Sequence, residues 1–362
     1  MTIISKYTFV FVWLLLVAIL FKNIKVYKQQ TVCGEVVNRW QFVFALIAFL
    51  PVIYFAAFTQ PRSDTVLYLH IYDKIQPTLK YLQNMLLEGN EKGWAVFQWL
   101  IKVIFGNNNQ IFRIILVSIH CIPVLFFFRK YSTDYLMSLY LFLAAGNHFA
   151  WMMNGIRQYI AVSIIMAAVP LMLKKKYLPL VLIILFASTF HTSALIMLPI
   201  VFIAQGEPWN KKTLFFILLA VIFTYIFSQD TGVLNSMFEN THYENSIANA
   251  INEGDDGVNP LRVLVYAVPA ILAFIGRKKI SKCNNQIINL SVNMSIITAC
   301  IYLIAMVTSG ILIGRLTIYT SLFGFVLLPY LIREIFEPKA AKFVNAAMVV
   351  LYFLYYYLER GI

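Results

Sequence analysis

Apolar residues fill most of the chain in long stretches, which short groups of charged residues separate. A stretch of about 20 apolar residues can cross the hydrocarbon core of a bilayer as a helix. A membrane β-barrel would instead show alternating segments of about ten residues, and such segments do not dominate here. We therefore predict an all-α, polytopic integral membrane protein with about 12 transmembrane helices.

The apolar stretches give the expected boundaries of these helices. The predicted spans are residues 7–21, 40–58, 109–128, 135–150, 156–173, 177–190, 192–205, 213–228, 260–276, 286–308, 311–332 and 342–358. We expect short helices to meet near His191, because one continuous helix over 177–203 would invert the later topology. Short or broken helices are tolerated where they line a protein cavity. The run 286–332 is too long for one span, and we place its break near Gly310 and Gly314.

Two longer segments between the spans fall on the predicted outer face. Residues 59–109 include an apolar stretch, Trp94 to Phe105, which is too short to span and favours a re-entrant or interfacial helix. Residues 229–259 form an acidic, asparagine-rich outer loop. Since no internal repeat is visible, we expect residues 1–362 to form a single multi-spanning membrane domain.

Composition supports the bilayer as solvent. Hydrophobic residues make up 60% of the chain and charged residues 12%, whereas a soluble domain carries roughly 25% charged residues. In the predicted topology, most lysines and arginines lie in loops on one side, which is therefore cytoplasmic. The net charge of +13 thus indicates topology and attraction to anionic lipid, and it needs no nucleic acid. The four cysteines show no spacing typical of a metal site or a disulfide framework.

Several arginines lie at the predicted outer face, although the positive-inside bias disfavours them there. Arg157 and Arg315 each open a long apolar helix, and ionisable residues near hydrocarbon usually line a functional cavity. Arg62 and Arg262 fit the same role or that of helix-end arginines that extend to the interface. Guanidinium groups bind phosphate oxygens through paired hydrogen bonds, and helix N-termini add positive dipole ends. We predict that Arg157, Arg315, Arg62 and Arg262 bind a pyrophosphate.

Candidate proton acceptors lie in the same outer segments. Asp64, His191 and Glu91 compete for the role of catalytic general base, which must lie near the cationic pocket. A solvated loop acid and a hydrogen-bonded turn histidine are the structural alternatives for Glu91 and His191. These three residues could also bind a divalent ion, but no paired-carboxylate or histidine motif supports it, so we expect no metal. The chain has no phosphate-binding loop, and we expect no cofactor and no ATP-driven step.

Further polar and aromatic residues accompany these groups. Asn154, Arg157 and Gln158 have a spacing typical of one helix face. Tyr68 follows Asp64 by one turn, and Tyr319 follows Arg315 by one turn. The predicted substrate-binding residues are Tyr68, Asn154, Gln158, Tyr319 and His148. The aromatic residues placed to stack on a substrate ring are Tyr68, Trp94, Trp99 and Trp151.

Together these segments resemble the EpsG family of bacterial polysaccharide-synthesis proteins, a Wzy-like group. The resemblance covers roughly residues 55–330. It lies in Arg62, Asp64 and Tyr68, in Glu91 with Gly93, in Gly155–Gln158 followed by Ala161, in Lys174–Lys176, in the segment Ala187–Ile196, and in Arg315.

The resemblance implies a glycosyltransferase that polymerises polyprenyl-pyrophosphate-linked oligosaccharide repeats into exopolysaccharide, capsule or O-antigen. It places the protein in the bacterial cytoplasmic membrane with its site facing the periplasm or exterior. A flippase and a chain-length regulator of the same pathway are further implied partners. Direct displacement of the pyrophosphate would invert the anomeric centre without a metal. A lipid-linked oligosaccharide ligase, a polysaccharide flippase or transporter, and a non-catalytic assembly partner remain alternatives.

Overall fold

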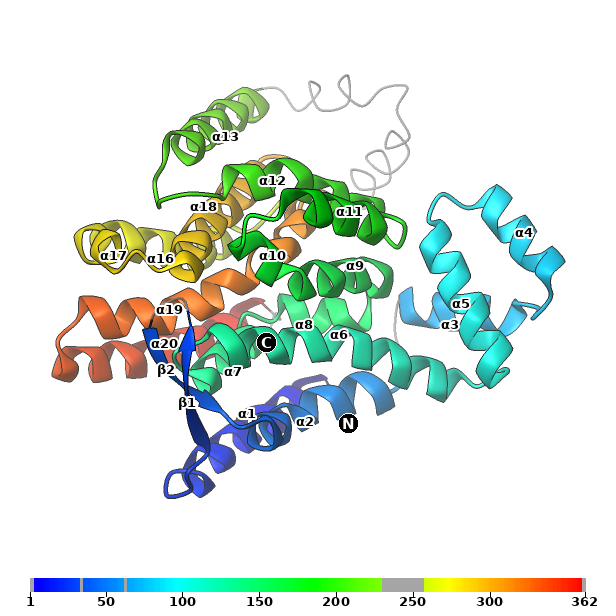
Figure 1. The fold of residues 1–362 in the computed structure, drawn as a ribbon, viewed down its shortest axis with the longest axis horizontal. Coiled ribbons are helices and arrows are strands. Elements are labelled where there is room, and N and C mark those ends of the chain that lie inside the picture. Colours follow the sequence, from blue (N-terminus) through cyan, green and yellow to red (C-terminus); the bar gives the residue numbers. More distant parts are fainter. Residues whose placement is uncertain (1–2, 33–34, 62–63, 230–256, 360–362) are drawn as a thin grey trace. The chain divides into compact units, whose positions relative to one another are not determined.

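Helices dominate the computed structural model, which describes residues 3–32, 35–61, 64–229 and 257–359 (Figure 1). They make up 79% of it, which confirms the all-α class. The chain folds as two compact units, and each is described by itself. Unit 1 comprises residues 1–195 and 342–362, and unit 2 comprises residues 196–341.

Unit 1 contains the N-terminal elements and most of the C-terminal helix. Its elements are α1 (Ile3–Leu20), β1 (Tyr27–Val32), β2 (Glu35–Trp40), α2 (Phe42–Phe58), α3 (Asp64–Lys74), α4 (Leu79–Glu88), α5 (Lys92–Phe105), α6 (Asn109–Tyr131), α7 (Tyr135–Ala144), α8 (Asn147–Met153), α9 (Ile156–Ala167), α10 (Val169–Leu173), α11 (Tyr177–Ser188), η1 (Thr192–Ile196) at the border with unit 2, and α20 (Pro338–Glu359) from residue 342 on. Within this unit α6 packs against α2 and α9, and α11 packs against α9.

Unit 2 is arranged around one buried helix. Its elements are α12 (Met197–Ile203), α13 (Lys211–Gln229), α16 (Pro260–Ile275), α17 (Arg277–Cys283), α18 (Gln286–Met306), η2 (Gly314–Tyr319) and α19 (Leu322–Ile335). The central helix α18 contacts α13, α16 and α19. Polar side chains of α18 bind neighbouring segments, since Asn293 Nδ2 donates to the Ala204 carbonyl at 2.9 Å and Thr298 Oγ1 lies 2.7 Å from Thr320 Oγ1.

The long helices follow the predicted apolar stretches, but some predicted spans are divided. Residues 135–150 fall in α7 and α8, and residues 156–173 fall in α9 and α10. The predicted break near His191 is confirmed, because α11 ends at Ser188 and η1 begins at Thr192. The break in the run 286–332 is also confirmed, because α18 ends at Met306 and α19 begins at Leu322. Among the described residues, four helices are long and apolar enough to cross a membrane, or up to six if each of two bent pairs is one span. The chain is therefore a membrane protein.

A short β-hairpin between α1 and α2 departs from the helical pattern. Strands β1 and β2 pair in antiparallel register, with Tyr27 opposite Trp40. Their rings lie 5.8 Å apart and nearly perpendicular, and Trp40 is buried. The hydrophobic pattern does not predict this hairpin, because cross-strand packing rather than a long apolar run stabilises it.

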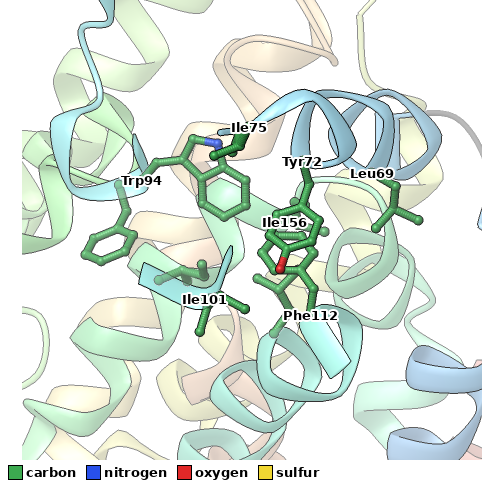
Figure 2. Packing of buried hydrophobic residues seen from close by; sticks show 10 residues of the cluster. Leu69, Tyr72, Ile75, Trp94, Ile101, Phe112 and Ile156 are labelled. Carbon is green, nitrogen blue, oxygen red and sulfur yellow. The ribbon is translucent and has the colours of Figure 1, made fainter. Parts of the chain in front are cut away.

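Buried side chains from the segment 59–109 pack against the bundle of unit 1 (Figure 2). Tyr72 of α3 stacks on Phe112 of α6 with ring centroids 4.2 Å apart. The remaining members of this cluster are Leu69, Ile75, Trp94, Ile101, Leu116, Ile156, Ile160 and Phe190. The predicted apolar segment 94–105 is thus helix α5, and the cluster packs it against α3, α6 and α9. This packing positions the candidate site.

Candidate active site

Arg157 lies in the first turn of α9 and contacts two residues from the segment 59–109. Its Nη1 lies 2.6 Å from Glu91 Oε2, and its Nε donates to the Tyr68 hydroxyl at 2.9 Å. The guanidinium carbon also lies 5.1 Å from the centre of the Tyr68 ring. The Glu91 side chain is 13% exposed and that of Arg157 is 35% exposed. Water therefore screens this pair less than an exposed one, while burial removes part of the hydration of both charges.

Glu91 is the residue before α5, but its side chain does not cap that helix. Its carboxylate instead accepts from Arg157 through Oε2 and from the Thr192 backbone N–H through Oε1, at 3.3 Å. Burial raises the pKa of Glu91 above its ordinary value of 4.5, while Arg157 and the Thr192 N–H oppose that rise. The carboxylate is therefore partly desolvated and held from both sides.

The start of α5 joins the end of α11 through backbone contacts. The backbone N–H groups of Gly93 and Trp94 both donate to the Thr189 carbonyl, at 2.9 and 3.3 Å. The first N–H groups of a helix have no partner within it, so Thr189 satisfies two of those of α5. This junction brings Glu91 against the segment that follows α11.

His191 lies in that segment and contacts Ser193. The Nδ1 of His191 is 2.7 Å from Ser193 Oγ, and the Ser193 backbone N–H donates to the same nitrogen at 3.3 Å. Gln158 of α9 donates from Nε2 to Ser193 Oγ at 3.2 Å. These contacts join three segments that are distant in the sequence. The first contributes Tyr68 and Glu91, the second Arg157 and Gln158, and the third His191 and Ser193. We call this group the Arg157 cluster, with members Tyr68, Glu91, Arg157, Gln158, His191 and Ser193.

The structure corrects three expectations in unit 1. Asn154 ends α8, and α9 begins only at Ile156, so Asn154 does not share a helix face with Arg157 and Gln158. Trp94 is 7% exposed and packs in the core against Tyr68, so it does not present a free face to a sugar. His148 is 1% exposed and lies among aromatic side chains, with Nδ1 3.4 Å from the Tyr159 hydroxyl, so it does not join the Arg157 cluster.

The remaining candidates are Asp64 in unit 1, Arg262, Arg315 and Tyr319 in unit 2, and Arg62, which falls outside the described residues. Asp64 begins α3 with an exposed side chain. Arg62 and most of the acidic loop 229–259 fall outside the described residues. Arg262 lies in the first turn of α16 in unit 2, as predicted. Arg315 lies in η2, a 3-10 helix in unit 2, so the prediction that it opens a long α-helix is wrong. Tyr319 ends the same 3-10 helix and is buried.

Two residues of the site had no assigned role at the sequence level. Ser193 orients His191 through its hydroxyl and its backbone N–H. In the sequence, a serine two residues after a histidine in a predicted turn could have indicated this contact. The Thr189 carbonyl accepts from the first N–H groups of α5. In the sequence, Gly93 could have indicated this contact, because a glycine lets the two backbones approach closely. Among the described side chains, no group of three or more histidine, cysteine or carboxylate residues is placed to hold a metal ion.

The chain is a helical membrane protein with a shielded arginine–carboxylate pair beside a histidine and a tyrosine. The chain belongs to the EpsG family, whose model matches residues 42–359. The EpsG family is a Wzy-like polymerase family, which gives the protein a polysaccharide polymerase-type role. No curated protein and no solved structure matches the chain significantly.

Proposed function

We propose that the protein polymerises polyprenyl-pyrophosphate-linked oligosaccharide repeats into exopolysaccharide, capsule or O-antigen. The observation that carries the proposal is the Arg157 cluster within a chain that matches the EpsG family over residues 42–359. A partly exposed arginine at the start of a helix suits an anionic group, and pyrophosphate is the anionic part of such a substrate. The chain is then a glycosyltransferase whose donor and acceptor are both lipid-linked saccharides.

The proposed reaction moves the growing chain onto a single repeat. A hydroxyl of the acceptor repeat attacks the anomeric carbon of the donor, and the polyprenyl pyrophosphate leaves with the bonding electrons. Arg157 stabilises the charge that develops on the pyrophosphate, as preorganised donors do in other transfers. Arg315, Arg262 and Arg62 assist it, and one of Asp64, His191 and Glu91 accepts the acceptor's proton. Direct displacement of this kind inverts the anomeric centre and needs no metal.

The topology we propose has about 12 spans, some of them short, in the bacterial cytoplasmic membrane. Helices α11 and α12 are too short to cross hydrocarbon without protein around them. The bent pairs α7–α8 and α16–α17 turn by 71° and 75°, which is typical of broken spans. The site faces the periplasm or the cell exterior. A flippase and a chain-length regulator are its expected pathway partners.

Polymer length on a gel tests the proposal. Cells that lack the protein would carry either the wild-type chain, Arg157→Ala or Arg333→Ala. Arg333 is a matched control, because it also pairs with a carboxylate, at 3.0 Å from Glu334, but its side chain is 56% exposed. We expect Arg157→Ala to accumulate single lipid-linked repeats at equal membrane level, with polymer reduced about 100-fold, the usual cost of removing one preorganised donor.

The other outcomes separate the alternatives. Full-length polymer in Arg157→Ala cells would contradict the catalytic role of the cluster and favour an assembly partner. Repeats that remain on the cytoplasmic side in cells without the protein would indicate a flippase. Normal polymer that is not attached to its final acceptor would indicate a ligase.

A further inference from the structure

The three candidates for the general base differ in how the structure holds them. His191 receives the Ser193 backbone N–H at Nδ1, and a backbone N–H can only donate. Nδ1 therefore carries the lone pair, and the proton of the neutral ring is on Nε2. Ser193 Oγ accepts from Gln158 and lies 2.7 Å from Nδ1, so its own hydrogen is directed to the same nitrogen. A ring in this tautomer donates from Nε2, which suits it to bind an oxygen rather than remove a proton.

Asp64 and Glu91 are both carboxylates, but their surroundings differ. Asp64 is exposed at the start of α3, and among the described residues no side chain orients it by a hydrogen bond or ion pair. Glu91 is 13% exposed, and the Thr192 N–H fixes one of its oxygens. A base must be held within hydrogen-bond reach of the proton that it removes. The fixed, partly desolvated carboxylate of Glu91 meets this requirement better than Asp64 does.

Arg157 has a second role in this arrangement. Its Nη1 donates to Glu91, and its Nε donates to Tyr68. A phosphate oxygen that binds this guanidinium competes with Glu91 Oε2 for the same donors, because both ligands are anions. When the phosphate displaces Oε2, the Thr192 N–H still holds Oε1 in place. The displaced oxygen then faces the site without the positive charge that had neutralised it.

We propose that Glu91 is the general base of the transfer and that its ion pair with Arg157 keeps it inactive until the donor pyrophosphate takes its place. This inference rests on the proposed polymerase function. The free Oε2 accepts the proton of the acceptor hydroxyl, whose oxygen bonds to the anomeric carbon. The bond from that carbon to the pyrophosphate breaks, and its electron pair leaves with the polyprenyl pyrophosphate. Arg157 binds that leaving group and afterwards pairs with Glu91 again, once the proton passes to water.

The arrangement couples the base to the donor. An enzyme whose base is ionised and free before the donor arrives can activate water, which would cleave the lipid-linked chain. A carboxylate paired with arginine is a weak base, and the approaching phosphate both removes the arginine and adds a negative charge nearby. Both changes favour the protonated carboxyl and so strengthen the base. The acceptor hydroxyl is thus activated only beside a bound donor.

The test compares Glu91→Gln and Glu91→Asp with Glu334→Gln, the matched change in the exposed Arg333–Glu334 pair. Polymer length is measured in cells, and binding of polyprenyl pyrophosphate is measured on purified protein in nanodiscs. We expect Glu91→Gln to reduce polymer about 100-fold, the range of general-base catalysis. We expect the same variant to bind polyprenyl pyrophosphate at least about threefold more tightly, because Arg157 loses its internal counter-ion. Glu91→Asp keeps the charge and should bind like the wild type but polymerise slowly.

Several outcomes would overturn the inference. Polymer near the wild-type level in Glu91→Gln would show that another group is the base. Weaker binding in Glu91→Gln would show that the carboxylate only positions Arg157. A variant that fails to reach the membrane is replaced in the comparison by Glu91→Asp, which retains both hydrogen-bond acceptors. Failure of the proposed function looks different, because cells without the protein would then make polymer of wild-type length.

Discussion

Gly93 and Thr189 lie in direct contact where α5 meets the end of α11. The Gly93 N–H donates to the Thr189 carbonyl at 2.9 Å, and a Cβ at position 93 would lie 2.1 Å from Thr189 Oγ1 and 3.1 Å from its carbonyl carbon. No side chain fits there without separating the two helix ends. Glu91 lies two residues before this contact, so the junction controls how the carboxylate meets Arg157.

Gly93→Ala should therefore impair both the fold and the site. Overpacking of this kind costs about 1–3 kcal/mol, and it moves Glu91 away from the Thr192 N–H. We expect a lower melting temperature in detergent and polymer shortened at equal membrane level. Thr189→Gly added to Gly93→Ala removes the nearest clashing atoms and should restore part of both. Lys92→Ala is the control, because Lys92 is exposed beside the same turn. If Gly93→Ala has the melting temperature and polymer length of the wild type, the junction accommodates a side chain at position 93 at no cost.

Arg157→Lys tests whether the shape of the guanidinium matters beyond its charge. Arginine contacts Glu91 through Nη1 and Tyr68 through Nε at once, and the single ammonium of lysine cannot reproduce this fork. We expect polymer formation to fall about tenfold or more, equivalent to about 1.4 kcal/mol of transition-state stabilisation. Arg333→Lys should have no effect. Full activity of Arg157→Lys would reduce the role of Arg157 to that of a positive charge.

Hydropathy locates the long apolar helices of this chain, because burial in a bilayer needs long apolar runs that are local in sequence. Helices α3, α4 and α17 lie outside the predicted spans, because their sequences contain more polar and charged residues. The breaks near His191 and Gly310 also follow from run length. Helix ends are less predictable. Asn154 looked like the first turn of α9, but it ends α8, and Gly155 separates the two helices. Arg315 looked like a helix start, but η2 precedes α19 by a further turn.

The members of the site could be predicted, but their pairing could not. Glu91 and Arg157 are 66 residues apart, and only the packing of α5 against α9 and α11 brings them together. Trp94 illustrates the same limit. An aromatic residue beside Glu91 fits a sugar platform in the sequence, but tertiary packing buries it under Tyr68. Sequence position gives the residue type available to a site, whereas contacts across the fold decide its role.

Donor binding should depend on pH through Glu91. Burial raises the pKa of this carboxyl above 4.5, and the groups that face it are Arg157, Tyr68 and the Thr192 backbone N–H. As pH falls through that raised pKa, Glu91 is protonated and releases Arg157, so polyprenyl pyrophosphate should bind more tightly. As pH rises, the carboxylate competes and binding weakens. Titration of the pyrophosphate itself affects both proteins equally, so the difference between wild type and Glu91→Gln isolates the effect of Glu91. Identical pH profiles would contradict the competition.

Ser193→Ala separates the orientation of His191 from its presence. The variant removes the hydroxyl that lies 2.7 Å from Nδ1 and that accepts from Gln158, while the backbone N–H contact to Nδ1 remains. We expect the tautomer to persist and polymer formation to fall about fivefold, the cost of one hydrogen bond of about 1 kcal/mol in the transition state. Ser188→Ala is the matched control, because the Ser188 hydroxyl binds only the Leu185 carbonyl of its own helix among the described residues. Threonine at 193 keeps the hydroxyl and should restore activity. If Ser193→Ala polymerises like the wild type while His191→Ala does not, the ring needs no support from Oγ, and the backbone N–H alone fixes its tautomer.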